Sequence, residues 1–108
     1  MQVALAAVVV TALGQVSPVN DRLPELDVAV SCRAAATAGL SVSESYQSCM
    51  NDERSARAEL ARDWTTFAGA DRSRCTTEAS GGGLPSYVEL LVCLQMSRDA
   101  AQMRRLPQ

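Results

Sequence analysis

Histidine and lysine are absent from this sequence of 108 residues. Histidine is the usual general base near neutral pH and the commonest metal ligand. Its absence excludes Ser-His-Asp and Cys-His catalysis as well as His-ligated zinc and haem sites, and the absence of lysine excludes Ser-Lys catalysis. An enzyme of this composition would have to use carboxylates or thiols.

Positive charge and aromatic surface are also limited. All ten basic residues are arginines and the formal net charge is −2, whereas a nucleic-acid-binding domain is expected to be basic. The sequence therefore predicts no nucleic-acid partner. The aromatic residues are Tyr46, Trp64, Phe67 and Tyr87. A core must rest on Leu, Val, Ala and Met, a modest apolar surface for the one small domain that this length allows.

An apolar run over residues 3–13 is typical of the hydrophobic region of a secretory signal peptide. It is too short to cross a bilayer, which requires about 20 residues. Ala12 and Gly14 are small residues at the −3 and −1 positions of a cleavage site before Gln15. We therefore expect residues 1–14 to be a signal peptide and the mature chain to be periplasmic or secreted, with no stable membrane span. The alternative is a short buried helix.

Beyond this run the sequence predicts helices and contains no strand pattern. Residues 15–24 hold two prolines and predict a linker, and residues 25–105 predict a single helical domain. Gly39 and Gly69 are expected to end the first and second helices. The four helices are expected over about residues 25–38, 43–68, 71–78 and 86–105.

The second helix has the strongest pattern. One face carries residues at three- and four-residue steps, namely Tyr46, Cys49, Met50, Glu53, Ala56, Leu60, Trp64 and Phe67. Glu53 is the one charged member of this stripe. Three interpretations of Glu53 are open: a catalytic carboxylate, an ion pair with Arg57 one turn further on, or a position at the edge of the stripe.

The fourth helix begins with a capping signal, because Ser86 and Glu89 have the spacing of a capping box. From Tyr87 to Met96 this helix is apolar on nearly every side. Such a helix is expected to be central and buried on most sides. For the shorter third helix, Asp71 is the expected N-cap.

Four cysteines in an exported chain predict two disulfides, for which three pairings are possible. The midpoint of Cys32 and Cys49 lies in the turn between the first two helices. The midpoint of Cys75 and Cys93 lies at the end of the glycine run 81–83. Residues equidistant from a turn face each other in an antiparallel helical hairpin, where inward-facing cysteines can reach the Cα separation of about 5.5–6 Å that a disulfide needs.

We therefore predict the pairs Cys32–Cys49 and Cys75–Cys93. Each would contribute about 3 kcal/mol in the loop-entropy model of disulfide stabilisation. The predicted fold is an all-α four-helix domain made of two disulfide-stapled helical hairpins.

Other chemistry fits the same residues less well. A four-thiolate zinc site and a redox dithiol both favour close cysteine pairs such as C-x2-C, and the sequence has none. The glycine run before a helix start could cradle an anion, but it lacks the Lys-Ser/Thr ending of a P-loop. We predict no catalytic residue, no cofactor and no metal.

A contact surface is predicted at the turn before the fourth helix, formed by Gly82, Gly83, Ser86 and Tyr87. Flexible backbone beside an aromatic side chain is a common contact site. The alternative is that Tyr87 packs between the second and fourth helices.

Three segments together are similar to a group of small exported bacterial proteins: SCRAAATAGLSVSESYQSCMNDERSARAEL, W-x2-F-x7-C and SYVELLVCLQMSRDA. The resemblance covers most of the mature length and includes the four cysteines, the long middle helix and the Gly-rich turn. The members of that group are uncharacterised, so the resemblance implies export and this fold and assigns no activity. A looser similarity links the chain to small cysteine-containing periplasmic domains that inhibit lysozyme.

These observations lead to three hypotheses. The first is a non-enzymatic, disulfide-stabilised exported protein of the bacterial envelope, which acts by contact with a protein partner that the sequence does not identify. The second is a periplasmic inhibitor of a cell-wall hydrolase. The third is a small enzyme that uses carboxylates or a free thiol. The sequence leaves the oligomeric state open.

Overall fold

The computed structural model describes residues 2–4, 7, 21–37 and 42–107, and of residues 42–44 only the backbone. This part of the chain forms helices and no strand, so the predicted all-α fold with four α-helices is confirmed. The α-helices are α1 (Val28–Thr37), α2 (Val42–Asp63), α3 (Gly69–Ser80) and α4 (Tyr87–Arg104). Short 3-10 helices follow α2 and α3, namely η1 (Trp64–Thr66) and η2 (Gly81–Gly83). None of the helices described is long and apolar enough to cross a membrane.

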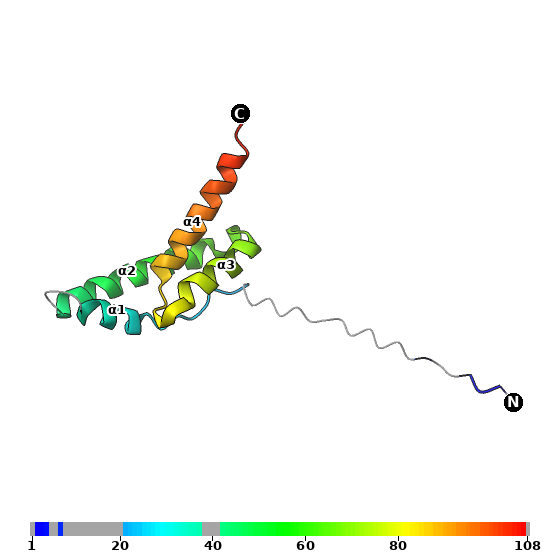
Figure 1. Ribbon diagram of the computed structural model, residues 1–108, viewed down its shortest axis with the longest axis horizontal. Coiled ribbons are helices and arrows are strands. Elements are labelled where there is room, and N and C mark those ends of the chain that lie inside the picture. Colours follow the sequence, from blue (N-terminus) through cyan, green and yellow to red (C-terminus); the bar gives the residue numbers. More distant parts are fainter. Residues whose placement is uncertain (1, 5–6, 8–20, 38–41, 108) are drawn as a thin grey trace.

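Two disulfides staple the helices in the predicted pairs. Cys32–Cys49 joins α1 to α2 with the Cα atoms 5.5 Å apart, and Cys75–Cys93 joins α3 to α4 with the Cα atoms 5.6 Å apart. Each disulfide closes a helical hairpin, and the two hairpins pack through α2 and α4. Figure 1 shows α1 alongside α2, while α4 crosses α2 and its C-terminal part extends beyond the other helices.

The core lies where α2, α3 and α4 meet. Leu60 of α2 and Leu90 and Leu94 of α4 are fully buried there. The buried side chains that pack with them are Ala56, Trp64, Phe67, Cys75, Ala79, Tyr87 and Leu91. The stripe predicted on the second helix is buried in this core from Glu53 to its end at Phe67.

The glycine run makes the turn between α3 and α4. Gly82 and Gly83 have φ values of +71° and +74°, in a region that residues with a Cβ atom rarely adopt. The chain can therefore reverse within a few residues, which brings Cys75 and Cys93 opposite each other.

Two helix boundaries differ from the predictions. α1 begins at Val28 rather than near residue 25, because the preceding segment forms hydrogen bonds with the Tyr87 hydroxyl instead of joining the helix, as described below. α2 ends at Asp63, and Gly69 begins α3 instead of ending α2. The backbone is extended at Phe67 (φ −79°, ψ 146°), so that the chain changes direction before α3 begins.

The N-cap predicted for the third helix is also wrong. Ala68 occupies the N-cap position, with no side-chain hydrogen bond. Asp71 lies in the first turn, where its carboxylate pairs with Arg74 at 3.1 Å. A carboxylate in the first turn is still stabilised by the positive end of the helix dipole. The predicted helix end at Gly39 and the predicted cleavage site before Gln15 lie outside the described residues.

Candidate interaction surface

The four residues of the predicted contact surface fall into two groups. Gly82 and Gly83 are exposed. Ser86 and Tyr87 are 9% and 2% exposed, so they belong to the interior, and the prediction that they form a contact surface is corrected. Their burial follows from hydrogen bonds to α2 and to the segment before α1.

Glu53 of α2 is buried against the start of α4. The exposed fraction of the residue is 4%. Its Oε1 atom accepts a hydrogen bond from Ser86 Oγ at 2.6 Å, and its Oε2 atom accepts one from the Tyr87 backbone N–H at 2.6 Å. Ser86 Oγ in turn accepts from the Glu89 backbone N–H at 3.2 Å, so Ser86 is the predicted N-cap of α4.

Glu53 therefore supplies negative charge and an acceptor at the N-terminus of α4, where backbone N–H groups lack partners within the helix. An ion pair with Arg57 was one of the interpretations from sequence, and it is wrong, because Arg57 pairs with Glu25 instead. An anion cradle at this helix start was the less favoured alternative from sequence, and the carboxylate of Glu53 occupies the place that an anion would take. Both carboxylate oxygens hold the fold together, which leaves Glu53 without a free oxygen facing solvent.

Tyr87 fastens the segment before α1 to the body of the protein. Its hydroxyl donates to the Pro24 carbonyl at 2.8 Å and accepts from the Leu26 N–H at 2.9 Å. Arg57 Nε also donates to this hydroxyl at 3.4 Å, and Arg57 Nη2 contacts Glu25 at 3.0 Å. The hydrogen bonds to Tyr87 and Glu25, together with the Glu25 charge, raise the pKa of Arg57 above its usual value.

This anchoring explains a difference from the sequence prediction. Leu23, Leu26 and Val28 pack against the core, and of these Leu23 lies in the segment 15–24 that the sequence predicts as a linker. The signal in the sequence was the pair of leucines on either side of Pro24. Sequence reasoning missed it because the partner of this segment, Tyr87, lies more than sixty residues further along the chain.

α4 has a second, exposed apolar side, which contradicts the prediction that it is buried on most sides. Its buried face carries Leu90, Leu91 and Leu94. The opposite side carries four large apolar residues with substantial exposure. They are Val88 (37%), Val92 (46%), Met96 (66%) and Met103 (71%).

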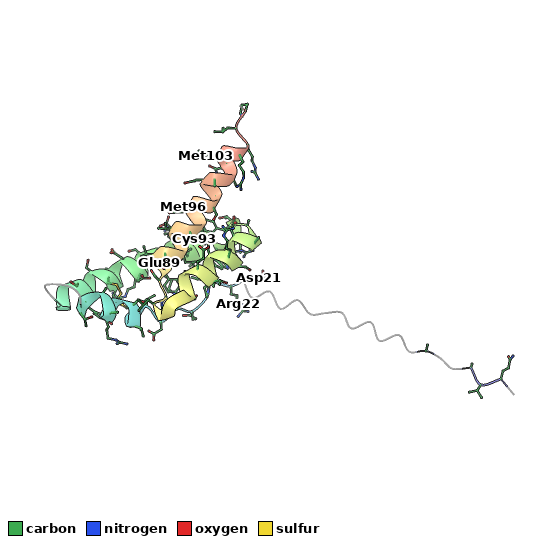
Figure 2. All side chains as sticks on the ribbon, in the orientation of Figure 1. Asp21, Arg22, Glu89, Cys93, Met96 and Met103 are labelled. Carbon is green, nitrogen blue, oxygen red and sulfur yellow. A yellow bond between two sulfur atoms is a disulfide. The ribbon has the colours of Figure 1, made fainter. Side chains whose placement is uncertain are left out.

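These residues form one continuous stripe. With 100° of rotation per residue, Val88, Val92, Met96 and Met103 fall within an arc of about 80°, and the exposed Ala100 widens this arc to about 120°. We call these five residues the α4 face. Figure 2 shows Met96 and Met103 on this helix, with Glu89 and Cys93 nearer its start.

A shallow groove of about 450 Å³ runs along the α4 face toward α3. Its apolar floor is formed by Val88, Val92 and Met96, and the Cys75–Cys93 disulfide joins its two walls. The charged groups on its rim are Arg74, Glu78 and Glu89. A second hollow shares Arg74, Met96 and Ser97 with this groove and extends it to Asp71, Ala100 and Arg104.

The described residues offer little for chemistry. All four cysteines are in disulfides, so none of them provides a free thiolate. Within the described ranges, no group of three or more His, Cys, Asp or Glu residues is placed to hold a metal ion. Comparison with protein-family models, with curated proteins and with solved structures found no match to this chain.

Proposed function

We propose that this protein is a non-enzymatic, disulfide-stabilised exported protein that acts by protein–protein contact through the α4 face. The observation that carries the proposal is the exposed stripe of Val88, Val92, Met96 and Met103. Single apolar residues on a surface need no explanation, but contiguous apolar patches with a polar rim mark interaction sites. The groove beside this stripe has such a rim.

Two observations support a site of action in the bacterial envelope. Disulfides form and persist in oxidising compartments such as the periplasm and are rare in the cytosol, and this chain has two of them. The apolar run over residues 3–13 has the composition of a signal peptide.

The non-enzymatic part of the proposal has its own support. A buried carboxylate is a frequent catalytic group, and Glu53 is a buried carboxylate in this core. Both of its oxygens accept hydrogen bonds from the start of α4, which gives it a structural role without any substrate.

Site-specific photo-crosslinking tests this function. A photoreactive amino acid would replace Met96 in the full chain, expressed in a bacterium that exports it to the periplasm. We expect a covalent protein adduct at this position that disappears when Val92→Glu is added. The control position is Arg62, an exposed residue of α2 away from the α4 face. Adducts that are equal at the two positions, or absent at Met96, would contradict the proposal.

A further inference from the structure

The charges around the α4 face are arranged with opposite signs at its two ends. Glu78 of α3 and Glu89 of α4 lie on the rim of the groove near the glycine turn. Arg104 lies at the far end, where the groove continues along α4. The middle of the rim is closer to neutral, because Arg74 pairs with Asp71.

An occupant that matches this groove must meet three requirements. It needs an apolar stripe to cover Val88, Val92 and Met96, as amphipathic helices do when they dock in grooves. It needs a basic group opposite Glu89, and an acidic group opposite Arg104. The α4 helix itself meets all three requirements when it is turned end to end.

We propose that the α4 face binds the α4 face of a second copy of this chain, with the two helices antiparallel. This inference rests on the proposed function, because it names the partner of the same face. In such a pair, residues symmetric about a point between Met96 and Ser97 lie opposite each other. Glu89 of one copy then faces Arg104 of the other, and Val92 lies near Ala100 and Met103.

The two-fold symmetry makes every favourable contact occur twice, as in most homodimers. Glu89 and Arg104 both lie on the edge of the stripe that faces α3, and a two-fold axis perpendicular to the helices brings these two edges together. Antiparallel helices also place opposite ends of their dipoles side by side. A parallel pair would place acid against acid and base against base.

The shape of the molecule leaves room for this arrangement. The C-terminal part of α4 extends beyond α2 and α3 in Figure 1. The side chains of residues 102–107 are all exposed. A projecting helix can therefore enter the groove of a second molecule without displacing any of its own contacts.

A charge exchange between two variants tests the proposal. The variants are Glu89→Arg and Arg104→Glu in the full chain with both disulfides formed. Either variant alone creates two like-charge contacts in the symmetric dimer, so its dimer dissociation constant should rise at least about tenfold over that of the native chain. An equimolar mixture restores both opposite-charge contacts and should form the mixed dimer at close to native affinity.

Sedimentation equilibrium would give the dissociation constants, and native mass spectrometry would separate the mixed dimer from the two homodimers by mass. Met96→Glu should abolish dimerisation while leaving the helical circular-dichroism signal intact, since Met96 is 66% exposed. Arg62→Glu on the outer face of α2 is the control and should leave the dissociation constant unchanged. A native chain that stays monomeric at millimolar concentration, or a mixture without the mixed dimer, overturns the proposal.

The crosslinking experiment separates this inference from the proposed function. An adduct at Met96 with twice the mass of the chain supports both. An adduct of another mass that Val92→Glu removes supports contact through the α4 face and overturns self-association. The absence of any adduct at Met96 counts against both.

Discussion

Glu53 offers a sharp test of how the two hairpins are held together. We expect Glu53→Gln to destabilise the fold and Glu53→Ala to destabilise it further. The carboxylate accepts two buried hydrogen bonds, from Ser86 Oγ and from the Tyr87 N–H, each at 2.6 Å. It also places a negative charge at the N-terminus of α4, where such a charge is favourable.

The magnitude follows from these contacts. A buried hydrogen bond to a charged group contributes about 1.5–3 kcal/mol. A glutamine at this position has one acceptor oxygen for two donors, so it keeps one bond and loses the other together with the charge at the helix end. We expect Glu53→Gln to lower the free energy of unfolding by about 2–4 kcal/mol. Alanine loses both bonds, and we expect a loss of about 3–6 kcal/mol.

The assay is urea denaturation followed by circular dichroism, with both disulfides intact and the slopes compared among variants. Asp52→Asn is the matched control, since Asp52 is the exposed neighbour of Glu53 on α2 and surface changes usually stay within about 0.5 kcal/mol. Hydrogen exchange of the Tyr87 amide gives a local readout and should become faster in Glu53→Gln. If the stability of Glu53→Gln equals that of Asp52→Asn, Glu53 does not hold α4 and the reasoning fails.

Three further predictions follow from the same structure. Tyr87→Phe removes the acceptor of the Leu26 N–H, so stability should fall by about 1–3 kcal/mol, and unchanged hydrogen exchange at Leu26 would contradict this. Replacing Cys75 and Cys93 by serine removes a disulfide between residues 18 positions apart. The free energy of unfolding measured by denaturation should fall by about 3 kcal/mol, and a fall of less than about 1 kcal/mol would contradict this prediction. In Gly82→Ala the new Cβ atom meets no atom within 4 Å, but the backbone must keep φ at +71°, so the free energy of unfolding measured by denaturation should fall by about 1–2 kcal/mol. Gly81 has φ −70°, so Gly81→Ala should lower the same quantity by less than half as much.

The parts of the fold that depend on local pattern could be predicted from the sequence. The disulfide pairs followed from the symmetry of the cysteines about two turns, because a hairpin brings equidistant residues together whatever surrounds it. The buried face of α2 followed from helical periodicity, and the capping role of Ser86 followed from its spacing to Glu89. Each of these relations spans fewer than twenty residues.

The parts that depend on distant contacts could not be predicted. The partners of Glu53 lie 33 and 34 residues away in the sequence, so its place in the stripe was visible while its role was not. The anchoring of Leu26 by Tyr87 spans 61 residues. Periodicity identifies a face that will be buried, but it does not say which polar groups that face will meet.

The contrast between Glu53 and the α4 face shows where a partner should be sought. A buried carboxylate would need a ligand or an unusual environment if its oxygens lacked donors, and those of Glu53 have them within the chain. The α4 helix presents the opposite case, because α2 and α3 cover one of its sides and the apolar residues on the other side remain exposed. The internal polar groups around Glu53 are satisfied by the fold itself. Val92, Met96 and Met103 are exposed instead, so the proposed partner is expected to gain its affinity by removing their apolar surface from water.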